Sequence, residues 1–181
     1  MTTFDQIKPT AGDTLASHEY ILDIAKYATT GVVPSSFINV PDFKDFAPAA
    51  PPKLANVTTY ANKGNTAQRK TGEDWTAQFN VLPIIGDDGS LQPELELLLA
   101  AADGIGAENL IWFQYYHARV ASLAYQGTAA VEVTRQNTGP EGEIEFYSIT
   151  LTGQGDRVKV QNPATAPGGD SNEGAIDPDG E

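Results

Sequence analysis

The feature that most constrains this chain is a strict alternation of apolar and polar side chains between Glu73 and Leu82. The apolar residues of the segment occupy odd positions: Trp75, Ala77, Phe79 and Val81. The polar residues occupy even positions: Asp74, Thr76, Gln78 and Asn80. Because successive side chains of a strand point to opposite faces, the segment predicts a β-strand with one buried and one solvent-facing side. A helix is excluded, since its period of about 3.6 residues would spread these apolar residues around the whole circumference.

Two later segments repeat the alternation. The segment from Arg119 to Arg135 carries apolar residues on odd positions: Leu123, Tyr125, Ala129, Val131 and Val133. The segment from Glu143 to Gln154 begins with Ile144 and Phe146 on the inward side and then changes parity, so that Ile149 and Leu151 take over. A parity change inside a strand predicts a β-bulge, here near Tyr147 and Ser148.

Three further segments are predicted as strands. The segment from His18 to Tyr27 alternates and predicts the first strand of the chain, and Val32 to Phe37 predicts a short second strand interrupted by Pro34. The segment from Asn109 to His117 is apolar on both parities, which predicts a strand covered on both faces.

One helix is predicted, from Ser90 to Ala102. Ser90 or Gln92 is its cap, acidic residues follow in the first turn, and Gly104 ends it. Four apolar residues share one face and predict packing against the sheet: Leu95, Leu98, Leu99 and Ala102.

Two segments are predicted to be loops. Val40 to Leu54 contains four prolines and is interpreted as an extended arm; its Phe43 and Phe46 either pack on their own subunit or dock on a neighbour. Asn62 to Gly72 is polar and locally basic. It is either a solvated tip or the complement of an acidic surface on a second copy.

Residues 1–17 are interpreted as an N-terminal arm, residues 18–161 as one β domain, and residues 162–181 as a disordered acidic tail. The predicted fold is mainly β: an antiparallel β-sandwich or strongly curved sheet with one flanking α-helix.

Charge and composition exclude several functions. The chain has 24 acidic and 11 basic residues, giving a net charge of −13, so it offers few cations for binding nucleic acid through phosphate. No apolar run is long enough to cross a bilayer. The absence of cysteine excludes disulfides, thiolate metal sites and thiol catalysis, and it fits folding in a reducing cytoplasm.

No catalytic constellation is recognisable. His18 and His117 are far apart in the sequence, and neither has a carboxylate at metal-ligand spacing. His117 is interpreted as a strand-end residue rather than a general base. The Gly153–Asp156 segment leads into another strand rather than a helix, so it is interpreted as a bulge or turn and not a phosphate loop. The sequence therefore predicts a protein that is not an enzyme and uses no metal or cofactor.

Four segments resemble a known family. Thr58–Gly64, Thr71–Thr76, Ala124–Ala129 and Phe146–Asp156 are similar to the corresponding strands and turns of the major tail tube proteins of long-tailed bacteriophages. The resemblance covers roughly residues 18–161 and consists of strand and turn patterns without a catalytic signature.

The resemblance implies a structural virion protein that forms hexameric rings, stacked into a tail tube through which DNA passes without specific binding. It implies assembly in the host cytoplasm, and tape-measure, tail-terminator and tail-tip proteins as partners. The polar residues that alternate with the apolar ones along the strands are expected to face the lumen: Asp74, Thr76, Gln78, Asn80, Glu132 and Glu145. The expected inter-ring contacts are Lys63, Asn65, Gln68, Arg69 and Lys70, with Phe43 and Phe46 as arm contacts.

Two other functions fit the same pattern. One is the tube protein of a contractile secretion system, which passes protein instead of DNA. The other is a monomeric β-sandwich module for binding or capsid decoration.

Overall fold

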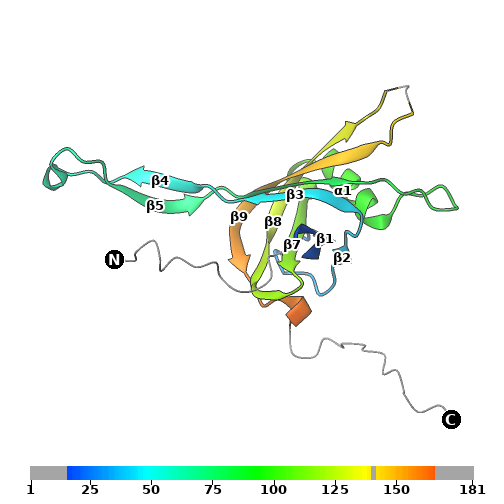
Figure 1. Ribbon diagram of the computed structural model, residues 1–181, viewed down its shortest axis with the longest axis horizontal. Helices are drawn as coiled ribbons and strands as arrows, with labels where there is room; N and C mark the ends of the chain where they lie inside the picture. The colour runs from blue at the N-terminus through cyan, green and yellow to red at the C-terminus, as the bar shows by residue number, and fades with distance from the viewer. Residues whose placement is uncertain (1–15, 140–141, 166–181) are drawn as a thin grey trace, which may run out of the picture.

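The computed structural model describes residues 16–139 and 142–165. The predicted arm over residues 1–17 and tail over residues 162–181 therefore lie largely outside the described residues. Seven strands form one antiparallel sheet in the order β2-β1-β7-β8-β9-β6-β3 (Figure 1). Their bounds are β1 Tyr20–Lys26, β2 Ile38–Asn39, β3 Phe43–Ala49, β6 Thr76–Val81, β7 Leu110–His117, β8 Val120–Gln136 and β9 Phe146–Lys159. The remaining strands, β4 Pro52–Asn56 and β5 Gln68–Glu73, pair only with each other.

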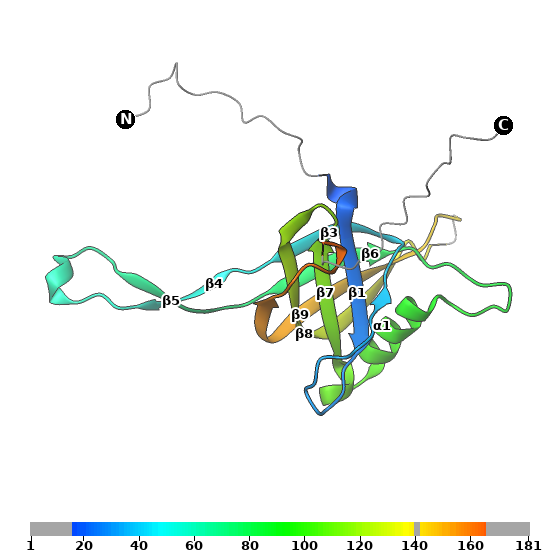
Figure 2. The same ribbon diagram turned by 90° about the horizontal axis from the view of Figure 1, so that it is seen from below.

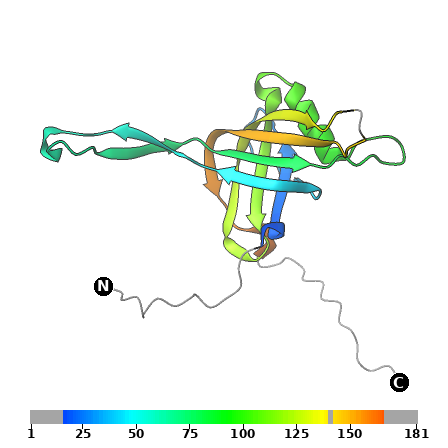
Figure 3. The same cartoon turned by 45° about the horizontal axis from the view of Figure 1, so that its top comes forward.

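The seven-stranded sheet curls on itself, so that its two halves enclose the core. Figure 3 shows β3, β6 and the first part of β9 crossing the direction of β1 and β7. The long strands β8 and β9 contribute to both halves. The predicted antiparallel β fold with one helix is confirmed, and both layers come from a single curved sheet.

The corner of the curled sheet is built around Trp75. A Cβ atom on Gly127 would lie 2.7 Å from the indole Cζ2, and one on Gly153 would lie 2.3 Å from Cε2, so only glycine fits at either position. The indole Nε1 donates a hydrogen bond to the Gly155 carbonyl at 3.1 Å. Trp75 is 3% exposed, and its ring stacks on Phe113 of the opposite half. The tryptophan therefore fixes how sharply the sheet folds.

The predicted bulge near Tyr147 and Ser148 is wrong. From Phe146 to Gln154, β9 pairs with β8 without a register break, and the break falls instead between Gln126 and Thr128. Tyr147 is buried, with Ile149 and Leu151 on the same parity.

The inward orientation expected for the start of this segment is also wrong. Ile144 is 73% exposed, and Phe146 is half-buried with the Lys44 ammonium 4.3 Å from its ring centre. The apparent parity change arose because these two residues face away from the core.

Helix α1, Pro93–Asp103, confirms the helix prediction. Gln92 is its N-cap, Pro93 opens the first turn and Gly104 is the C-cap. Leu95 and Leu98 are fully buried in the core, as expected, and Ala101 is buried more deeply than Ala102. The helix packs mainly on β8, against the sheet face that carries the apolar side chains (Figure 2).

The Pro-rich segment from Val40 to Leu54 is not a loop, and this prediction is wrong. It forms β3 and β4. Proline is tolerated here because β3 is an edge strand and Pro52 is the first residue of β4, so neither requires a full set of ladder donors. The short strand predicted over Val32 to Phe37 is also wrong, since the segment is irregular and the strand begins only at Ile38.

The predicted loop from Asn62 to Gly72 forms one side of a hairpin. Strands β4 and β5 extend away from the sheet along the long axis of the molecule, with the short 3-10 turn Tyr60–Asn62 at the tip (Figures 1 and 2). The tip is held by Asn62 Oδ1, which accepts hydrogen bonds from the Thr59 N–H at 2.7 Å and the Thr59 hydroxyl at 3.0 Å.

The C-terminal end of the described chain is anchored at β7. Asn162 is 1% exposed, and its Nδ2 donates to the carbonyls of His117 at 2.7 Å and Val120 at 2.9 Å. His117 is the last residue of β7, as the sequence indicated, and its Nδ1 accepts a hydrogen bond from the Arg119 N–H at 3.2 Å. In the described chain, α1 falls short of the length and apolar character that a membrane span requires.

Candidate functional site

The solvent-facing side of β3, β6, β9 and β8, here called the polar face, carries small polar side chains in rows across the strands. In one row Gln78 lies between Ala47 and Thr150, and Glu132 follows on β8. The neighbouring rows are Ala49–Thr76–Thr152–Ala130 and Lys44–Asn80–Ser148–Thr134.

The alternation of side chains along the strands therefore places four of the expected lumen residues on one face. Thr76, Gln78 and Asn80 lie on β6 and Glu132 lies on β8, all on the polar face. Their apolar alternates, such as Phe79 and Val131, are buried on the other side of the sheet. Across these rows the face is dominated by hydroxyl and amide groups, with Glu132 as the carboxylate of β8 and Lys44 as a cation on the edge strand β3.

Charged groups at the edge of the polar face are engaged within the subunit. Asp45 Oδ2 accepts a hydrogen bond from Asn80 Nδ2 at 2.8 Å. Asp45 has φ 58, a left-handed conformation that places it at the register shift of β3 between Lys44 and Ala47. This irregularity bends the edge strand locally.

Asp74 lies outside the rows. It precedes β6 at the root of the hairpin, where its Oδ1 is 2.6 Å from Lys53 Nζ and both side chains are exposed. Its backbone N–H donates to the Pro51 carbonyl at 3.0 Å, closing the hairpin root.

Glu145 also lies outside the rows, just before β9. Its Oε1 accepts a 2.6 Å hydrogen bond from Arg135 Nε, and the Arg135 guanidinium lowers the pKa of this carboxyl. Arg135 lies opposite Tyr147 in the β8–β9 ladder, and the Tyr147 side chain is on the buried face of the sheet. The Glu145 carboxylate is therefore held toward the helix side of the sheet.

The hairpin brings the expected inter-ring residues together. Lys63 and Asn65 lie at the tip, and β5 carries Gln68, Arg69 and Lys70, all of them exposed. Lys63 adopts a left-handed conformation and ends the 3-10 turn.

The two aromatic residues of the presumed arm pack on their own subunit. Phe43 lies 6.4 Å from the ring of Phe79, and Phe46 lies 5.3 Å from Tyr115 and 5.6 Å from Tyr20, measured between ring centroids. Both side chains border the core. Of the two alternatives that the sequence left open, intrasubunit packing is the one observed.

A charged network at the hairpin root was not anticipated. Glu73, the last residue of β5, is 2.7 Å from Lys70 Nζ and 3.5 Å from Arg157 Nη2. Arg157 also donates to the Tyr115 hydroxyl at 2.8 Å and lies over the Tyr125 ring. The hydrogen bond from Lys70 lowers the pKa of the Glu73 carboxyl, and burial raises the pKa of Tyr115. No local sequence pattern signals the contacts of Arg157, because they join strands far apart in the chain.

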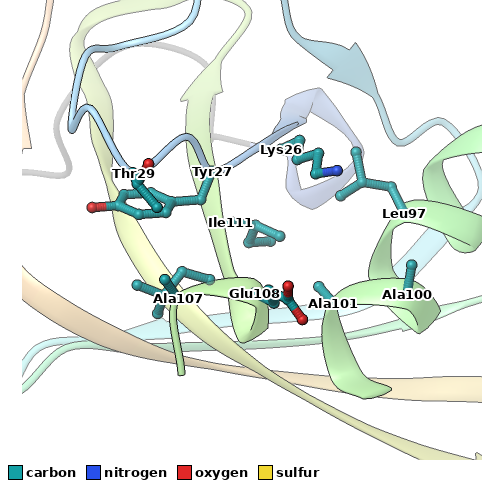
Figure 4. Close-up of a pocket in the computed structure, with 10 residues that line it drawn as sticks. Lys26, Tyr27, Thr29, Leu97, Ala100, Ala101, Ala107, Glu108 and Ile111 are labelled. Carbon is teal, nitrogen blue, oxygen red and sulfur yellow. The ribbon is translucent and has the colours of Figure 1, made fainter. Parts of the chain in front are cut away.

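A cavity of about 400 Å³ lies between the end of β1, α1 and the turn before β7 (Figure 4). Its walls are mainly apolar, including Tyr27, Leu97 and Ile111, with Lys26 and Glu108 at its border. Among the described residues, no group of three or more histidine, aspartate or glutamate side chains is placed to hold a metal ion.

No protein-family model matches the sequence, and no curated protein matches it. Solved structures do match the fold. The tail tube of SPP1 aligns with a TM-score of 0.59 at 12% identity, covering 82% of this chain and 80% of that one. This chain has the tail tube fold. The tail of a gene transfer agent particle with C6 symmetry gives a TM-score of 0.56 at 11% identity over 81% of this chain and 99% of that one.

The tube-terminating cap of the anti-feeding prophage also shares the fold, with a TM-score of 0.54 and 9% identity over 88% of this chain and all of that one. The curled antiparallel sheet with one flanking helix is consistent with this fold.

Proposed function

We propose that this protein is a structural virion component that assembles into stacked hexameric rings and forms the tail tube of a long-tailed bacteriophage. The observation that carries the proposal is the four-stranded polar face on a subunit with the tail tube fold. The six-fold symmetry of the related gene transfer agent tail supports six copies per ring.

Two unpaired strand edges support ring formation. The outer edge of β3 has no strand partner in the described chain, and neither does the edge of β8 beyond Val131, where pairing with β7 has ended. Exposed edges favour pairing with another chain. Lateral contact between these two edges of neighbouring copies would continue the polar face around a closed ring.

The dimensions of such a ring suit a DNA conduit. Six copies of a four-stranded face, with strands about 4.8 Å apart and tilted by about 40°, give a circumference of roughly 150 Å. Subtracting side chains leaves a bore of roughly 35–40 Å, which admits a DNA duplex.

The chemistry of the polar face suits passage without binding. Hydroxyl and amide groups at Thr76, Gln78, Thr150 and Thr134 form no ion pairs with phosphate, and Glu132 repels it. Asp74 and Glu145 are assigned to the hairpin root and the β8–β9 turn rather than to this surface. The DNA, tape-measure, terminator and tip proteins are the partners that this role requires.

The direct test is negative-stain electron microscopy of the concentrated protein, with and without tail-tip components to nucleate assembly. We expect hollow tubes with six-fold cross-sections. A protein that stays monomeric under both conditions would refute the proposal and favour a binding or decoration module.

A tube-terminating cap is the second candidate, because the chain shares its fold with the anti-feeding prophage cap. A cap ends polymerisation, whereas a tube subunit adds to its own kind. Extended polymers of the purified protein therefore support the tube, and single rings that stop growth of another tube support the cap.

A further inference from the structure

The two ends of the molecule differ in chemistry. The β4–β5 hairpin lies at one end of the long axis, and the connection between β6 and α1, residues 82–91, lies at the other (Figures 1 and 3). Residues 51–72 contain Lys53, Lys63, Arg69 and Lys70 and no acidic residue. Residues 82–91, here called the far-end loop, contain Asp87 and Asp88 and no basic residue.

The far-end loop is ordered, yet it exposes large apolar side chains. The Gln92 side chain joins its two arms, accepting from the Ile84 N–H at 2.7 Å and donating to the Leu82 carbonyl at 2.6 Å. An isolated bridge pairs Ile85 with Leu91. Ile84 is 46% exposed and Ile85 is 69% exposed. A preformed apolar loop of this kind is typical of an interaction surface.

The acidic part of the far-end loop is also fixed. Asp88 Oδ1 accepts hydrogen bonds from the Ser90 hydroxyl at 2.6 Å and from its N–H at 3.1 Å, and these bonds lower the pKa of the Asp88 carboxyl. The aspartate therefore stays charged and in place beside the isoleucines. A cationic and partly apolar ligand would complement both features.

The hairpin tip has that combination. Tyr60 is fully exposed, and Val57 and Leu54 are each about half exposed. Lys63 follows Tyr60 by three residues and is held next to it by the bond from its N–H to the Tyr60 carbonyl at 3.1 Å. An isolated two-stranded hairpin is marginally stable in water, so contact with a partner would stabilise this one.

We infer that the far-end loop is the acceptor for the hairpin tip of a second copy of this chain. Tyr60 and Val57 pack on Ile84 and Ile85, and Lys63 lies against the two aspartates. The inference rests on the proposed function, because it assigns the contact between successive rings. The contact is heterologous, since donor and acceptor are different surfaces at opposite ends, and such contacts repeat without closing. All subunits of the tube then point the same way.

Disulfide crosslinking tests this assignment cleanly, because the chain has no native cysteine. Tyr60→Cys and Ile85→Cys proteins are prepared separately, mixed, assembled and treated with a mild oxidant. A disulfide requires Cα atoms within about 7 Å, so a crosslinked dimer forms only if the tip reaches the far-end loop. The matched control pairs Tyr60→Cys with Ile105→Cys, because Ile105 is also exposed but lies outside the far-end loop.

We expect a dimer from the Tyr60–Ile85 mixture and none from the control mixture. Tubes without a Tyr60–Ile85 dimer would overturn the acceptor assignment and leave the proposed function intact. Wild-type protein that forms no tubes would overturn the proposed function and this inference with it.

A charge exchange covers the case in which the cysteine at the tip impairs assembly. Lys63→Glu should raise the concentration needed for tube formation about tenfold or more, as expected for like charges brought together. Adding Asp87→Lys to the same chain should restore assembly, whereas Asp87→Lys with native Lys63 should not assemble normally. Failure of the second change to rescue the first would contradict the contact.

Discussion

Gly153→Ala is expected to destabilise the subunit strongly through Trp75. The new Cβ would lie 2.3 Å from the indole Cε2, 2.4 Å from Nε1 and 2.5 Å from Cδ2. Carbon atoms in contact prefer about 3.5–4.0 Å, so the ring or the strand must move by more than an ångström. The Trp75 ring cannot move freely, because its Nε1 is hydrogen-bonded to the Gly155 carbonyl and the ring is stacked on Phe113.

The expected cost follows from these contacts. Overpacking of a core costs about 1–3 kcal/mol, and this close approach belongs at the upper end. Loss of the indole hydrogen bond adds about 1 kcal/mol. The smaller conformational freedom of alanine in the unfolded chain returns about 0.4–1 kcal/mol. The free energy of unfolding should therefore fall by about 3 kcal/mol, a large part of the total stability of a domain.

Urea denaturation followed by circular dichroism measures this change. Gly139→Ala is the matched control, since a Cβ there meets nothing within 4 Å, and it should leave the stability unchanged or slightly raised. In a Trp75→Leu background, Gly153→Ala should cost little, giving a coupling of about 3 kcal/mol in a double-mutant cycle. An additive cycle, or a Gly153→Ala protein as stable as wild type, would refute the proposed role of Trp75 at the corner.

Three other outcomes are expected. Glu132→Lys should slow DNA release or lower the yield of infectious particles while tubes still form, and Glu132→Gln should behave as wild type in both assays; equal effects of the two changes would argue against phosphate repulsion. Asn162→Ala should reduce the free energy of unfolding by about 2 kcal/mol, because it leaves the buried His117 carbonyl without its donor, and a change below about 0.5 kcal/mol would contradict the anchoring role. Stability should fall as the pH drops below about 4.5: ion pairs and hydrogen bonds lower the pKa values of Glu19, Glu73, Asp88 and Glu145, so the unfolded chain takes up protons first. A flat stability profile between pH 6 and about pH 3 would contradict that linkage.

The sequence predicted those parts of the fold that depend on local periodicity. Alternation located β6, the apolar run located β7, and the cap and glycine signals located α1, because each pattern is set by neighbouring residues. The curling of the sheet onto itself could not be predicted in this way. It depends on contacts of Trp75 with Gly127 and Gly153, which are distant in sequence.

The same distinction applies to the candidate site. Thr76, Gln78, Asn80 and Glu132 share the polar face because strand parity fixes their direction. Asp74 and Glu145 lie beyond the strand ends, where parity no longer determines where a side chain points, and each is turned to a cation instead.

Strand β3, in the proline-rich segment from Val40 to Leu54, was missed for a different reason. Its Pro48 argues against a central strand but not against an edge strand, and edge position is a property of the whole sheet.

Cryo-electron microscopy of assembled tubes, at a resolution that traces individual strands, would show which face of the subunit lines the lumen. We expect the β3–β6–β9–β8 face to line the lumen, with Gln78 and Glu132 directed toward the axis. Tubes in which this face is turned outward or buried between subunits would contradict it.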